Sequence, residues 1–165
     1  SLLGHAIHLD GYEKDQMCEL QAVAVHCPTS NLFLGSGLFD LVDLKKKGVR
    51  TAVATDTGGG TSHSMLQTLA EAYKIQQLRE NSLSPLEAFY WGSLGNACAL
   101  GLNHEIGSFD IGRFADFIVI NSRATELSAI RMKNCESLLE ELFVIQTLGD
   151  DRFIESVYIA GKKWK

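Results

Sequence analysis

One carboxylate stands between a short apolar run and three glycines in VATDTGGG, residues 53–60 of the chain. An acid that ends a buried strand, followed by a loop flexible enough to approach a ligand, suits metal binding or proton transfer. The same residues also make an ordinary turn, in which Asp bonds its own backbone and Gly supplies the unusual dihedral angles. The stretch alone leaves both interpretations open, so a chemical role for Asp56 depends on partners elsewhere in the sequence.

Two histidines end earlier apolar runs at spacings that could bring them to Asp56. His26 follows His5 by 21 residues and precedes Asp56 by 30. A parallel barrel of about 250 residues in eight strand-helix units uses roughly 31 residues per unit, and its catalytic groups come from the carboxyl ends of the strands. The three side chains would then share one rim. A catalytic zinc at such a rim needs three or more ligands and lowers the pKa of its water to about 7.

The elements that would position these residues follow a strand-helix alternation. Short apolar runs at residues 2–9, 23–25 and 52–54 predict buried strands. Helical patterns occupy residues 13–20, 39–47, 64–80 and 84–101, the last two opened by capping sequences. A strand at 115–120, a helix at 137–148 and a late strand at 156–162 follow. We therefore predict an α/β chain with a division between residues 1–105 and 106–165.

Composition excludes several classes of function. The 165 residues are 45% hydrophobic and carry a net charge of -5, which gives no basic footprint for nucleic acid. No run of about 18 apolar residues is present for a membrane span, and the first residues do not resemble a signal peptide. The four cysteines are widely separated, which indicates reduced thiols rather than disulfides. We expect a cytoplasmic chain with neither nucleic acid nor membrane as a partner.

Three segments carry a family resemblance. The segments GHAIHL (4–9), HCPTSNLFLGSG (26–37) and TDTGGG (55–60) resemble, in this order, the later part of the amidohydrolase superfamily. Residues 64–74 and 148–152 are similar to the branch of metal-dependent aminohydrolases that acts on guanine. The resemblance implies the C-terminal part of a TIM-like (β/α)8 barrel, with its last three strand-helix units in 1–105. Residues 106–165 would supply strands of a small β-sandwich with an intervening helix.

The resemblance also implies a reaction, namely hydrolytic deamination of guanine to xanthine and ammonia by a zinc-activated water, a step of purine catabolism. Asp56 matches the metal-ligating aspartate that shuttles a proton, and His5 matches the histidine that orients the water or polarises the purine. Both would contact the substrate. Residues 26–31, which have the composition of a turn, would form part of the pocket wall. Alternatives are an aminohydrolase or chlorohydrolase of another nitrogen heterocycle, such as a triazine or a modified adenosine, and a non-catalytic assembly protein.

Part of the family's metal site has no match in these residues. Its His-x-His pair, a later metal histidine and a proton-relaying glutamate are expected upstream of Ser1, in a missing N-terminal portion of the same enzyme. Three barrel strands cannot close a sheet, so the chain should need that portion as a partner. We expect zinc to be absent or incompletely held in this chain alone and the chain to be inactive, and the resemblance implies that the whole enzyme is a homodimer.

Overall fold

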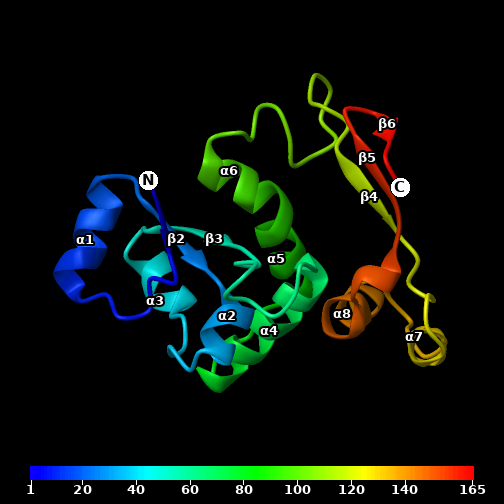
Figure 1. Ribbon diagram of the computed structural model, residues 1–165, viewed down its shortest axis with the longest axis horizontal. Coiled ribbons are helices and arrows are strands. Elements are labelled where there is room, and N and C mark those ends of the chain that lie inside the picture. The colour runs from blue at the N-terminus through cyan, green and yellow to red at the C-terminus, as the bar shows by residue number, and fades with distance from the viewer.

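The computed structural model describes residues 1–165 as two small sheets connected by helices (Figure 1). The first sheet is parallel, in the order β1 (Leu2–Gly4), β2 (Val23–His26) and β3 (Arg50–Val53). The predicted strand at residues 2–9 is shorter than expected. His5 and Ala6 adopt φ angles of 69° and 47°, which an extended strand cannot contain.

Helices follow each of these strands. The first, α1 (Gly11–Glu19), begins at a capping box in which Asp10 accepts from the Glu13 amide and the Glu13 side chain accepts from the Asp10 amide. After β2 come α2 (Pro28–Phe33) and α3 (Leu41–Lys46). The turn composition of residues 26–31 was misleading here, because Pro28 occupies the first helical position, where its missing N–H costs nothing.

The longest helix, α4 (Met65–Leu78), and the next helix, α5 (Pro85–Tyr90), begin where the capping sequences predicted. The predicted helix at 84–101 is not continuous. A π-helical turn at Trp91–Gly95 separates α5 from α6 (Asn96–Leu100), which ends at Gly101 with a left-handed φ of 74°. Asn96, the first residue of α6, bonds through its side-chain amide to the backbone of Val53 in β3.

The main core lies between the parallel sheet and the helices that follow its strands. Its fully buried members include Phe39, Leu44, Leu69 and Leu83. Burying one such side chain contributes about 1.5–3 kcal/mol. The core therefore holds the strands in place, and the residues that follow their carboxyl ends lie at its edge.

The second sheet is antiparallel and lies on the opposite side of the molecule from β1 and α1 (Figure 1). Its strands are β4 (Phe117–Ile120), β5 (Ile154–Ile159) and β6 (Lys162–Lys163). Between β4 and β5 run α7 (Glu126–Met132), α8 (Leu138–Leu148) and a 3₁₀ turn at Asp151–Phe153. The sequence did not predict α7, although Thr125 and Ser128 form its capping box.

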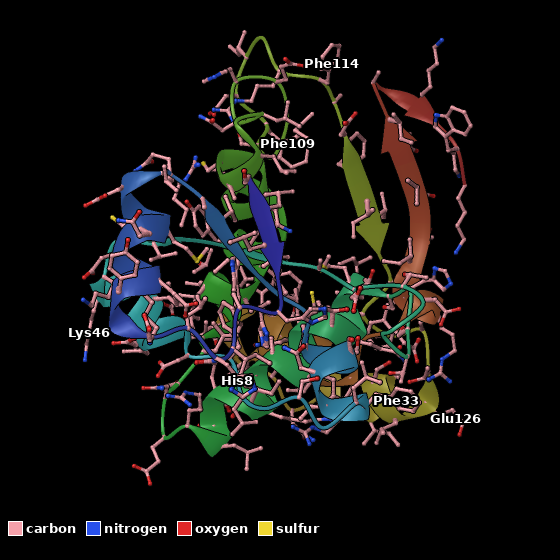
Figure 2. The ribbon with its side chains drawn as sticks, turned by 60° about the vertical axis from the view of Figure 1, so that its left-hand side comes forward. His8, Phe33, Lys46, Phe109, Phe114 and Glu126 are labelled. Atoms are coloured by element: carbon pink, nitrogen blue, oxygen red, sulfur yellow. The ribbon has the colours of Figure 1, made fainter.

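The chain segment that precedes β4 and leads into the second sheet exposes aromatic side chains. Phe109 and Phe114 lie in this loop at one end of the molecule, far from α2 and Phe33 (Figure 2).

No helix combines the length and apolar character that crossing a membrane would require. The division into residues 1–105 and 106–165 as separate domains remains a prediction.

Candidate active site

The parallel sheet brings His5 and Asp56 together although their strands are not neighbours. β2 lies between β1 and β3, with Gly4 paired to Val25 and His26 paired to Val53. Across the end of β2, His5 Nε2 approaches Asp56 Oδ2 to 3.8 Å. Both side chains remain partly exposed. Two of the three residues expected at the rim therefore meet at the carboxyl edge of the sheet, where a ligand could reach them.

Both residues hold their side chains on a left-handed backbone. The φ angles are 69° at His5 and 51° at Asp56, a conformation that residues other than glycine seldom adopt. Hydrogen bonds secure each one: the His5 amide donates to the Val25 carbonyl at 2.9 Å, and the Asp56 carbonyl accepts from the Gly60 amide at 2.6 Å. Such backbone strain is concentrated at functional sites.

The glycine loop packs closely over the Asp56 carboxylate. A Cβ atom at Gly59 would lie 2.9 Å from Asp56 Oδ2 and 3.0 Å from Ser30 Oγ, closer than real side chains pack. The backbone at residue 59 can therefore approach the carboxylate only because no side chain is present. The sequence predicted only a flexible loop for the glycines after Asp56. Gly59 also has a steric function, because it leaves room for the Asp56 carboxylate.

Cys27 is a third group at the site; the sequence indicated a reduced thiol within the expected pocket wall and not a group beside Asp56. Potential ligand atoms of His5, Cys27 and Asp56 all lie within 4.8 Å of one another. Burial is the main factor that raises the pKa of the Cys27 thiol; a hydrogen bond from the His5 backbone lowers it and the Asp56 charge raises it. Nitrogen, sulfur and carboxylate oxygen are the donor types that zinc prefers, so this group fits a divalent cation.

His26, the third residue expected at the rim, lies elsewhere. Its side chain is completely buried and stacks on Phe39, with ring centroids 4.5 Å apart, and near Trp91 at 5.7 Å. Successive side chains of a strand point to opposite faces, and His26 shares the face of Ala24, which contacts the main core. Burial lowers the pKa of His26 to about 3, which keeps the ring neutral.

His8 also lies apart from the site residues. Its Nε2 atom is 2.7 Å from the carbonyl oxygen of Ser36, so the ring ties the loop after β1 to the segment after α2. This contact gives His8 a structural partner. It makes no hydrogen bond or ion pair with His5 or Asp56.

Beneath the His5–Asp56 pair, the first turn of α2 presents three buried polar side chains. Thr29 Oγ1 donates to the Thr55 carbonyl at 3.2 Å, and His5 Nδ1 lies 2.8 Å from Asn31 Oδ1. Ser30 is fully buried and its hydroxyl has no protein partner. In the sequence these residues have the composition of a turn and the resemblance made them part of the pocket wall, and their burial together with the contacts identifies them as support for the pair.

With this geometry established, comparison with known proteins defines the family. The sequence profile described as "Amidohydrolase family" matches residues 2–163. The chain belongs to the amidohydrolase family. Among curated relatives of this amidohydrolase, guanine deaminase of Escherichia coli (strain K12) is 47% identical over 161 residues, and guanine deaminase of Rattus norvegicus is 38% identical over 174. The matches cover 98% and 99% of this chain but only 37% and 38% of the relatives.

Solved structures give the same grouping. E. coli guanine deaminase matches with a TM-score of 0.97 at 46% identity, covering 99% of this chain and 38% of that one. Guanine deaminase from C. acetobutylicum with bound guanine matches with a TM-score of 0.85 at 29% identity, with coverage of 98% and 38%. An adenosine deaminase from Xanthomonas campestris with bound zinc scores 0.80 at 27% identity, with coverage of 98% and 36%. The predicted fold class and family resemblance are confirmed, and this amidohydrolase spans less than two fifths of each relative.

Proposed function

We propose that this chain contributes part of the active site of an amidohydrolase that hydrolyses guanine to xanthine and ammonia. The observation that carries the proposal is the His5–Asp56 pair, 3.8 Å apart at the carboxyl edge of the parallel sheet. It occurs in a chain 47% identical to E. coli guanine deaminase. In this reaction water adds to the ring carbon that bears the exocyclic amino group, the C–N bond breaks, and the nitrogen leaves with a proton.

The proposed cofactor is one zinc ion per complete site, with Asp56 as the ligand from this chain. Support comes from the donor types gathered at the site and from the zinc bound to the X. campestris relative. A zinc ion supplies Lewis acidity and lowers the pKa of water. Further ligands would come from additional sequence of the same protein, in keeping with the share of each relative that this chain spans.

The two side chains divide the proton chemistry between them. One oxygen of Asp56 can hold the cation while the other accepts a proton from the attacking water and delivers it to the leaving nitrogen. His5 Nε2, which lies 3.8 Å from Asp56 Oδ2, can orient the water as a hydrogen-bond acceptor or, when it carries a proton, polarise the purine as charge develops. Both side chains are therefore proposed to contact substrate. A homodimer and a cytoplasmic location remain expectations of this proposal.

The proposal is tested on the complete polypeptide encoded by the gene that contains this sequence. We expect xanthine to form from guanine, and Asp56→Asn and His5→Gln to lower kcat by about 10²–10⁴-fold, the usual contribution of a positioned acid or base. Asp15→Asn is the matched control, because Asp15 pairs only with Lys47 at the surface. Turnover of triazines or modified adenosines without guanine turnover would overturn the substrate assignment, and full activity of Asp56→Asn would overturn the site.

A further inference from the structure

We propose that Asn31 is a positioning residue that fixes the ring orientation and the tautomer of His5. The ring has two polar contacts: Nδ1 lies 2.8 Å from Asn31 Oδ1, and Nε2 lies 3.8 Å from Asp56 Oδ2. The imidazole thus bridges a buried amide on α2 and the carboxylate after β3. Only the rate measurement below rests on the proposed function, since the tautomer itself is a property of the protein.

Asn31 is held rigidly enough to act in this way. Asn31 is completely buried in α2. Its backbone N–H donates to the Cys27 carbonyl at 2.9 Å, and its backbone carbonyl accepts from the Ser36 N–H at 2.9 Å. α2 is anchored at Pro28 and packs against α4. The His5 side chain, by contrast, is 47% exposed on a left-handed backbone. The side-chain amide of Asn31 is therefore the fixed partner, and the imidazole of His5 is the group that is oriented.

The chemistry of the contact selects one tautomer. An amide oxygen only accepts hydrogen bonds, so His5 Nδ1 must carry the proton, and the neutral ring keeps its lone pair on Nε2. That nitrogen faces Asp56, where the proposed reaction moves protons. In the opposite tautomer, two lone pairs would face each other at 2.8 Å. The contact with Asn31 therefore leaves the Nε2 lone pair directed at the site without any rotation of the ring.

The choice of an amide has a further consequence. A carboxylate in the same place would orient the ring equally well, but its charge would also stabilise the imidazolium form. Asn31 orients the ring without adding charge to a site that already contains Asp56. The buried amide nitrogen of Asn31 has no protein partner, so the oxygen contact to His5 is the only hydrogen bond of this side chain.

The first test reads the tautomer directly. Long-range ¹H–¹⁵N spectra of the complete polypeptide, recorded at a pH where imidazole is neutral, report which ring nitrogen carries the proton. The His5 signals are assigned by their loss in His5→Gln. We expect a protonated Nδ1. A protonated Nε2 in the unsubstituted protein would overturn the proposal, whether or not the protein converts guanine.

The second test separates positioning from packing. Asn31→Leu keeps the volume and removes the acceptor, and we expect kcat for guanine to fall about 10–100-fold, as for other orienting residues, with KM within about twofold. Asn31→Asp keeps the acceptor and should have a higher kcat than Asn31→Leu, although its added charge beside Asp56 should keep kcat below that of the unsubstituted protein. Gln146→Leu is the matched control, because it removes an equally buried amide from α8, which packs on α4, α5 and α7, and should leave kcat unchanged.

The outcomes are distinguishable. An Asn31→Leu variant with unchanged kcat, or an Asn31→Asp variant as impaired as Asn31→Leu, would overturn the proposal. If Asn31→Leu does not fold, the spectrum of the unsubstituted protein and the activity of Asn31→Asp decide. Failure of the unsubstituted protein to convert guanine would overturn the proposed function alone, because the spectrum still reports the tautomer.

Discussion

At the scale of single residues, the site combines strained backbone with closely packed support. Left-handed conformations of the kind seen at His5 and Asp56 cost on the order of 1–3 kcal/mol each and persist only where the surroundings impose them. For Asp56 these surroundings are the glycine loop, whose backbone bonds to the Asp56 carbonyl and approaches its carboxylate. The position of the carboxylate should therefore be sensitive to one added methyl group.

Substitution of Gly59 tests this sensitivity. Its φ angle is not in the left-handed region, so Gly59→Ala acts through the new Cβ atom, which would crowd Asp56 Oδ2 and Ser30 Oγ. We expect kcat/KM for guanine to fall at least about tenfold as the carboxylate is displaced, since a shift of about 1 Å can cost 10²-fold. Gly11→Ala is the control, because a Cβ at this helical position meets nothing within 4 Å. Equal activity of the two variants would contradict the steric function of Gly59.

The buried ring of His26 predicts a dependence of stability on pH. Its pKa is about 3 in the folded protein and about 6.5 when unfolded, so between these values the unfolded chain binds a proton that the folded chain does not. Stability should therefore fall as the pH is lowered from about 6.5, by up to about 1.4 kcal/mol per pH unit. Urea unfolding from pH 8 to pH 5 should show this slope, and His26→Leu should reduce it. An identical slope in both proteins would show that His26 is not its source.

At the scale of elements, α6 contacts β3 and hydrogen-bonds to its backbone through one side chain. Asn96, which follows the π-helical turn, bonds to the strand edge that does not pair with β2. Asn96 Oδ1 accepts from the Val53 amide, and Asn96 Nδ2 donates to the Val53 carbonyl, both at 2.9 Å. One side chain thus satisfies both backbone groups of Val53, three residues before Asp56.

Removal of this amide should weaken β3. Asn96→Leu leaves the Val53 N–H and C=O without partners, and we expect a loss of about 1–3 kcal/mol in the free energy of unfolding. Activity should also fall, because the strand leads directly to Asp56. Asn134→Leu serves as the control, since the Asn134 side chain makes only a long contact within its own helical turn at 3.5 Å. Urea unfolding compares the two variants, and equal stability would remove the proposed role of Asn96.

The same elements show what could be predicted from the sequence. Capping residues located α4 and α5 correctly, because Ser64 and Ser84 act through contacts three residues away. Spacing placed His5 and Asp56 at one edge, since the carboxyl ends of parallel strands meet there. It failed for His26, because spacing gives the end of a strand and not the face to which a side chain points. The resemblance placed the segment that contains Cys27 and Asn31 in the pocket wall, but it did not give their individual roles, since these depend on contacts made only after folding.

At the scale of the whole molecule, the exposed surface is large for the size of the chain. The accessible area is 9490 Å², whereas a compact monomer of 18.1 kDa is expected to expose about 8,100 Å². Part of this surface belongs to the parallel sheet, whose outer strands β1 and β3 each pair with β2 alone. Leu2 and Leu3 of β1 are 54% and 45% exposed. Unpaired edges beside apolar side chains are templates for association with further strands.

This surface predicts the behaviour of the 165-residue chain produced alone. We expect concentration-dependent association in sedimentation velocity, driven by the free edge of β1 and its exposed leucines. Leu3→Lys should reduce that association, because a charge on an edge strand opposes strand pairing. In the complete polypeptide we expect the same region to be covered, so Leu3→Lys should there lower stability instead. The isolated chain could instead sediment as a monomer over the whole concentration range, both with and without Leu3→Lys. That result would contradict the proposal that the edge of β1 requires further strands.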